Sequence, residues 1–70
     1  MLRVGDRVCP ILSMHMKGTI TEILMRPHKQ MLVGGSLSYM TYIRVNHDKQ
    51  IAGGFSIVEY PASELMKIDD

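Results

Sequence analysis

The sequence is poor in cysteine and has no long hydrophobic run. One cysteine, Cys9, among 70 residues allows no internal disulfide. Small secreted domains usually depend on such bridges, so we expect a protein of the reducing cytoplasm. The charged N-terminus lacks the apolar run of a signal peptide, and no uncharged apolar run is long enough to cross a bilayer. We therefore expect neither export nor a membrane partner.

The residue patterns that hold metals or perform catalysis are also missing. There is no CxxC, no paired histidine spacing and no phosphate-loop glycine pattern. Met14-His15-Met16 offers ligand types that suit copper(I), but in an extended chain the two methionines point to one side and the histidine to the other. This stretch is better interpreted as a loop before a strand, with Gly18 at its corner. We predict no catalytic residue, no metal site and no cofactor.

The chain has little net charge, but its charged residues are unevenly placed. The formal net charge is +1, yet residues 1–50 hold seven basic and three acidic side chains, while residues 51–70 hold one basic and four acidic ones. A chain that binds nucleic acid through phosphates usually has a stronger basic excess. The asymmetry indicates a dipolar surface.

Helical periodicity over three turns is absent, and the apolar residues favour short strands instead. The clearest strand covers residues 37–45, where Tyr39, Ile43 and Val45 share one face with Leu37 and Thr41. Further strands are predicted to end near Pro10 and to cover residues 19–25, 51–58 and 65–68. Turns are predicted at Gly5-Asp6 and over the polar residues 46–49. A single helical turn is predicted over residues 61–65, where proline suits the first position.

The second predicted strand breaks strict alternation, because Ile20 and Ile23 are three residues apart. One extra residue near Thr21-Glu22, a β-bulge, would return both isoleucines to the same face. We expect Pro27 to end this strand. Residues 27–36 then form a mobile loop that contains the apolar patch Met31-Leu32-Val33.

Four segments together resemble small SH3-like barrels, among them KOW-type domains and barrel subunits of photosynthetic and redox complexes and of nitrile hydratase. The resemblance spans nearly the whole chain and rests on residues 5–8 (GDRV), 17–23 (KGTITEI), 42–45 (YIRV) and 61–65 (PASEL). It implies one all-β domain over residues 1–70, a five-stranded SH3-like barrel with a short helical turn before the last strand. It also implies a binding module or accessory subunit.

A barrel of this size is filled by its own side chains and leaves little room for a substrate cavity, so we do not expect an enzyme. The predicted core is Val4, Val8, Ile20, Ile23, Tyr39, Ile43, Val45, Phe55, Ile57, Leu65 and Ile68.

The expected function is therefore a protein-interaction module, an adaptor, inhibitor or accessory subunit that docks onto a larger partner. Contact would run through the 27–36 loop and the outer face around Tyr42 and Arg44, because a small soluble domain should not expose the apolar loop patch without use. The candidate binding residues are Arg26, His28, Lys29, Met31, Leu32, Tyr42, Arg44 and Tyr60.

Two alternatives stay open. The first is a KOW-like protein that contacts the phosphates of RNA or DNA through Arg26, Lys29, Arg44 and Lys49. The second is a homo-oligomer, with the 37–45 strand or the 27–36 loop pairing across a two-fold axis. The short chain begins with Met1 and is expected to be a complete gene product, and its size fits a phage or accessory-genome origin.

Overall fold

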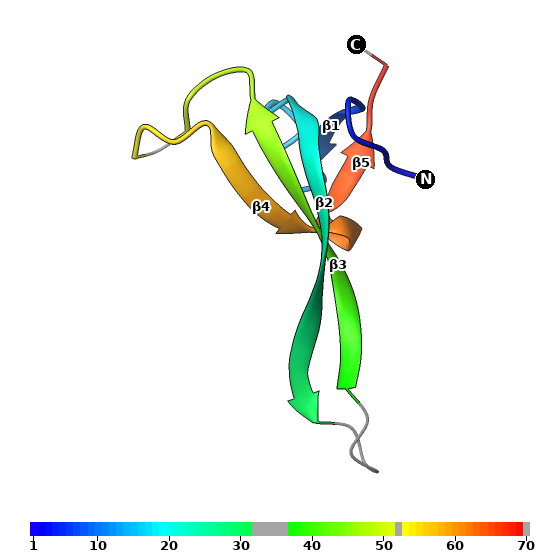
Figure 1. The fold of residues 1–70 in the computed structure, drawn as a ribbon. Coiled ribbons are helices and arrows are strands. Elements are labelled where there is room, and N and C mark those ends of the chain that lie inside the picture. The colour runs from blue at the N-terminus through cyan, green and yellow to red at the C-terminus, as the bar shows by residue number, and fades with distance from the viewer. Residues whose placement is uncertain (32–36, 52, 70) are drawn as a thin grey trace.

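The strands form a single antiparallel sheet with the order β4-β3-β2-β1-β5 (Figure 1). The computed structural model describes residues 1–31, 37–51 and 53–69. Its elements are β1 (Arg7–Pro10), β2 (Gly18–Met31), β3 (Leu37–His47), β4 (Ile57–Pro61), the 3₁₀ turn η1 (Ala62–Glu64) and β5 (Leu65–Lys67). These elements confirm the all-β class, the five strands and the short helical turn before the last one. The described strand pairings leave β4 and β5 as the two edges of the sheet.

Local sequence signals account for the first strand and for the turn that precedes it. The predicted turn at Gly5-Asp6 is confirmed, and the backbone N–H of Arg3 donates to the Asp6 carboxylate at 2.9 Å. Pro10, which has no backbone donor, is the last residue of β1, as expected. The N–H of Gly5 donates to the Ile20 carbonyl at 2.9 Å and thereby fastens the turn to β2.

The predicted bulge in the second strand is also confirmed. The register passes from Ile20↔Val45 directly to Glu22↔Arg44, so Thr21 is the extra residue. The Thr21 hydroxyl donates to the Arg44 carbonyl at 3.2 Å. Ile20 and Ile23 thus face the same side of the sheet, as the bulge hypothesis requires.

Pro27 does not end β2, which corrects the prediction of a loop from residue 27. The strand continues to Met31 and pairs with β3, which begins at Leu37. Pro27 lies opposite Tyr39, and the register shifts immediately after it. A bulge is one of the few places where a sheet tolerates proline, because the missing donor coincides with irregular pairing. Residues 32–36, the rest of the predicted loop, lie outside the described residues.

The third and fourth strands also depart from the predicted bounds. β3 extends through Asn46 and His47, which the sequence placed in a polar turn. β4 begins at Ile57, whereas a strand was predicted from Ile51. The reason is the Gly53-Gly54 pair: both residues have positive φ, 88° and 80°, and turn the chain back before β4 can start.

The core is smaller than predicted. Five buried apolar residues form one cluster, with Leu2, Tyr60 and Ala62 packed against it: Val8, Ile20, Ile43, Val45 and Leu65. Cys9 is also buried, and Ile68 is only half-buried. The core prediction is wrong for five exposed residues: Val4, Ile23, Tyr39, Phe55 and Ile57. Alternation assigns a face to a residue, but whether another layer covers that face depends on distant elements.

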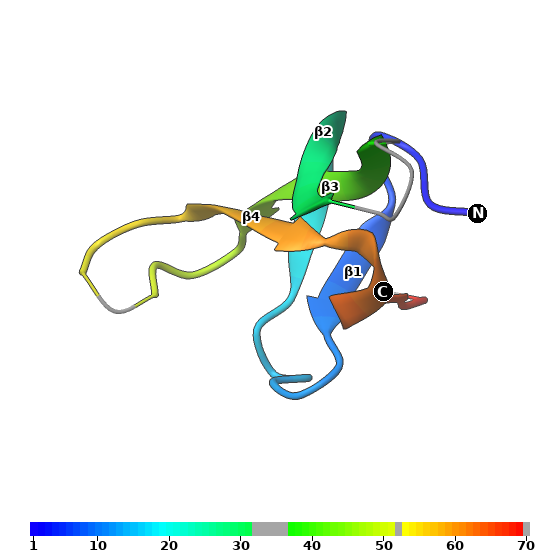
Figure 2. The same ribbon diagram turned by 90° about the horizontal axis from the view of Figure 1, so that it is seen from below.

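The distal half of the β2–β3 hairpin extends away from this core (Figure 1). β3 pairs with β4 over Tyr42–Asn46, and β2 pairs with β1 at Gly18 and Thr19, so the hairpin continues beyond both neighbours. We call residues 25–31 of β2 and 37–41 of β3 the arm, and the rest the body. The radius of gyration is 13.6 Å, against about 11 Å for a compact chain of this length. Seen from below, β2 and β3 cross one another (Figure 2).

Candidate functional site

The outer face is the side of the sheet opposite the core. It carries Glu22 on β2, Tyr42 and Arg44 on β3, and Glu59 on β4. The register places Glu22 and Glu59 on either side of Arg44, and directly opposed residues in a sheet share a face. Arg26, four pairs further along β2 than Glu22, belongs to the same face because it lies opposite Met40, which alternates in step with Tyr42 and Arg44.

Charges on the outer face neutralise one another. Nε and Nη2 of Arg26 donate to the two oxygens of Glu59 at 2.8 and 2.9 Å. Nη1 of Arg44 lies 2.8 Å from Oε1 of Glu22, and its Nη2 lies 3.5 Å from Oε1 of Glu59. The Arg26 hydrogen bonds hold the pKa of Glu59 below its usual range. Such exposed pairs add little to stability, but a phosphate group would have to displace a carboxylate to reach either arginine.

Tyr60 lies on the other side of the sheet from Tyr42 and Arg44. Its backbone pairs with buried Ile43, and its hydroxyl donates to Nε2 of His47 at 2.7 Å. Nδ1 of His47 donates to the carbonyl of Met16 at 3.0 Å. Since a carbonyl oxygen can only accept, the neutral imidazole carries its proton on Nδ1. Burial, reinforced by the nearby charge of Glu64, raises the pKa of Tyr60 and keeps its hydroxyl protonated.

Replacing Tyr60 by phenylalanine should lower the free energy of unfolding by about 1–2 kcal/mol, because Nε2 of His47 is then buried without a partner. His47 is 4% exposed, so water cannot easily replace the hydroxyl. Urea unfolding of Tyr60→Phe measures the change. Tyr39→Phe, at a tyrosine 60% exposed on the arm, is the control and should leave the midpoint unchanged. Equal midpoints for Tyr60→Phe and wild type would contradict the assigned hydrogen bond.

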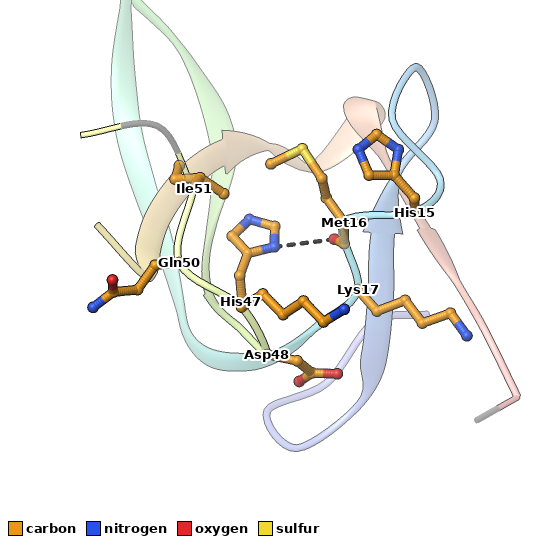
Figure 3. A pocket seen from close by; sticks show the side chains of 8 residues that line it. His15, Met16, Lys17, His47, Asp48, Gln50 and Ile51 are labelled. Carbon is orange, nitrogen blue, oxygen red and sulfur yellow. Dashed lines mark hydrogen bonds between the residues drawn. The ribbon is translucent and has the colours of Figure 1, made fainter. Parts of the chain in front are cut away.

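Beside His47, the loop before β2 and the loop after β3 enclose an open hollow of about 720 Å³ (Figure 3). The Met16 side chain points across it toward Ile51, and the His47 ring lies between them. Asp48 N–H donates to the Lys17 carbonyl at 3.0 Å and ties the two loops together.

The acidic group of this hollow is already engaged. Arg7 holds both carboxylate oxygens of Asp48, and these hydrogen bonds lower the pKa of Asp48. Nη1 of Arg7 also donates to the Thr19 hydroxyl at 2.9 Å. Asp48 therefore holds the two loops in place through its hydrogen bonds to Arg7. Across the described part of the chain, no three histidine, cysteine or carboxylate side chains gather as metal ligands.

On the arm, the core-facing side of the sheet continues without a layer to cover it. Met25 and Tyr39 are 64% and 60% exposed. Met25 lies opposite Thr41, whose hydroxyl donates to the Met25 sulfur at 3.2 Å. Tyr39 is two residues from Thr41 and so shares its face. Two large, largely apolar side chains therefore stand together on the projecting hairpin.

No family model matches this chain. Neither the search of curated proteins nor that of solved structures found a significant match. Among the described residues, no helix is long and apolar enough to span a membrane.

The structure brings together only part of the predicted binding set. Arg26, Tyr42 and Arg44 share the outer face, whereas Tyr60 contributes to the packing of the core. The backbones of three residues lie in the arm portion of β2, and their side chains are outside the described part of the structure: His28, Lys29 and Met31. Leu32 lies outside the described residues altogether. Lys49 is exposed at the hollow, just past the end of β3 that lies opposite the arm.

Sequence reasoning missed Met25 and Tyr39 as candidate contact residues. It ended the second strand at Pro27 and assigned Tyr39 to the core. One signal could have revealed them: the alternating pattern from Leu37 to Val45 is longer than a five-residue core cluster can cover. Where a long strand extends beyond the core, its residues must lie in solvent or against another molecule.

Proposed function

We propose that the protein is a small non-enzymatic interaction module that docks onto a larger protein through its arm and the adjoining outer face. The observation that carries this proposal is the arm itself: a two-stranded projection that bears exposed Met25 and Tyr39. Isolated two-stranded hairpins are at best marginally stable in water, so a hairpin of this length is a costly feature unless it has a use. Aromatic residues and methionine are enriched at protein interfaces.

The all-β body and the 3₁₀ turn before β5 agree with an accessory module of the SH3-like type, which we include in the proposal. The KOW-like alternative receives less support. Two of its four phosphate contacts, Arg26 and Arg44, are engaged by Glu22 and Glu59. A basic surface that attracts phosphates needs uncompensated charge, and the outer face balances two arginines with two glutamates.

Serine substitution of both arm residues, Met25→Ser with Tyr39→Ser, should weaken capture of the partner from the native cell at least about tenfold. Loss of a buried aromatic anchor alone commonly has that effect. The matched control is Met14→Ser with Phe55→Ser, which removes a methionine and an aromatic residue that are 57% and 66% exposed on the body. Affinity pull-down with quantitative mass spectrometry gives the comparison.

The control variant should capture the same partner as wild type. Equal losses in both variants, or in neither, would refute docking through the arm. If the captured material is nucleic acid that dissociates steeply with added salt, the KOW-like alternative replaces the proposal.

A further inference from the structure

The hollow beside His47 lies at the end of β3 that is opposite the arm, on the core-facing side of the sheet. His47 alternates in step with buried Ile43 and Val45, so its ring continues that side beyond the core. The volume of about 720 Å³ falls in the range of small-molecule sites, about 300–1,000 Å³. None of the residues that line the hollow belongs to the arm or to the outer face.

Hydrogen bonds hold both walls of the hollow in place. In the loop before β2, the Met16 carbonyl accepts from Nδ1 of His47, and the Met16 N–H donates to the Ser13 carbonyl at 2.9 Å. In the loop after β3, the Ile51 N–H donates to the Phe55 carbonyl at 2.8 Å. The hollow is therefore formed before a ligand arrives, and binding does not have to order either loop.

The surface of the hollow around His47 is apolar. The Met16 side chain points toward Ile51, with the His47 ring between them (Figure 3). Both ring nitrogens of His47 are already hydrogen-bonded, to the Met16 carbonyl and to the Tyr60 hydroxyl. A polar ligand group placed here would lose its hydrogen bonds to water and gain none, which is unfavourable. The part of a ligand that lies against this surface must therefore be apolar.

The charged residues of the hollow favour a single negative charge. The lining has two lysines, Lys17 and Lys49, and one carboxylate, Asp48, which Arg7 holds. Within the described part of the chain, no ion pair involves the exposed Lys49. Phosphate is commonly held by several strong donors, arginine above all, whereas one ammonium group suits a monoanion such as a carboxylate.

We propose that the hollow binds a small apolar carboxylic acid. The apolar body of the ligand packs against Met16, Ile51 and the face of the His47 ring, and its carboxylate forms an ion pair with Lys49. This ligand site lies at the opposite end of β3 from the arm. It goes beyond the proposed docking of a larger protein and does not depend on it.

Two flat probes that differ in charge test the proposal: cinnamate and its neutral amide, cinnamamide. In two-dimensional amide NMR, cinnamate should shift the resonances of residues 15–17 and 47–51, with a Kd on the order of 1 mM. Cinnamamide should bind at the same residues about fivefold more weakly, because it cannot form the ion pair.

Two lysine variants test the ion pair. Lys49→Gln should weaken cinnamate binding about fivefold and leave cinnamamide binding unchanged, because it removes only the positive charge. Lys67→Gln is the matched control at an exposed lysine on β5, outside the hollow, and should bind both probes as wild type does.

Two isoleucine variants test the apolar surface. Ile51→Ser should weaken the binding of both probes about threefold or more, because it removes apolar contact area. Ile57→Ser is the matched control: Ile57 is 53% exposed and lies opposite Asn46, on the outer face of the sheet. It should bind both probes as wild type does. Circular dichroism verifies that all four variants are folded.

The proposal would be overturned if cinnamate left the resonances of residues 15–17 and 47–51 unmoved, or shifted those of the arm equally. Equal affinity for cinnamate and cinnamamide would also overturn it. So would equal effects of Lys49→Gln and Lys67→Gln, or of Ile51→Ser and Ile57→Ser, on cinnamate binding.

Discussion

Gly18→Ala is expected to unfold most of the protein at room temperature. Gly18 lies between two strands, opposite Val8 on β1 and His47 on β3. A Cβ there would lie 2.6 Å from Cγ1 of Val45 and 2.7 Å from the Asn46 carbonyl oxygen. The backbone of β3 cannot move without disturbing the core. Overpacking of this kind costs about 3 kcal/mol or more, which is most of the stability of a domain this small.

Gly54→Asn separates this steric effect from the general loss of a glycine. Gly54 has a φ of 80° and open space around its Cβ position, and asparagine tolerates the left-handed region. We expect a loss below about 1 kcal/mol. Urea unfolding followed by circular dichroism measures both variants. A Gly18→Ala chain as stable as Gly54→Asn would contradict the close approach of β3 to β2.

Deletion of the arm is expected to leave the body folded. Arg26 and Met40 lie opposite each other, so replacement of residues 27–39 by Asn-Gly would join them through a two-residue hairpin turn. Every member of the core cluster lies outside the deleted segment, and the Arg26–Glu59 ion pair is retained. The free energy of unfolding should change by about 1 kcal/mol or less. Partner capture, in contrast, should disappear.

Much of the fold could be predicted because its signals are local. The Gly5-Asp6 turn, the bulge at Thr21 and the 3₁₀ turn after Pro61 are set by neighbouring residues, and the structure has all three. The alternation from Leu37 to Val45 likewise identified the central strand and its two faces.

The features that sequence reasoning missed depend on residues far apart in the chain. Pro27 is a strand terminator by local rules, but pairing with β3 carries β2 past it. His47 lies in a polar stretch that is typical of a turn. The Met16 carbonyl and the Tyr60 hydroxyl, however, form hydrogen bonds with both of its ring nitrogens, and these bonds allow the side chain to be buried.

The candidate site was only partly predictable for the same reason. Placing Tyr42 and Arg44 on one face needs only alternation. The partner of Arg26, however, is Glu59, 33 residues away on a strand that β3 separates from β2. No spacing rule within one strand indicates this ion pair, and without it the two arginines resemble an uncompensated basic surface.

The central claim is that the body maintains the fold and the arm makes the contact with a partner. Capture by the chain that lacks residues 27–39, measured beside wild type at equal concentration of folded protein, tests it most directly. We predict an unfolding transition close to that of wild type and no partner above background. A shortened chain that folds and still captures the partner at the wild-type level would contradict the claim.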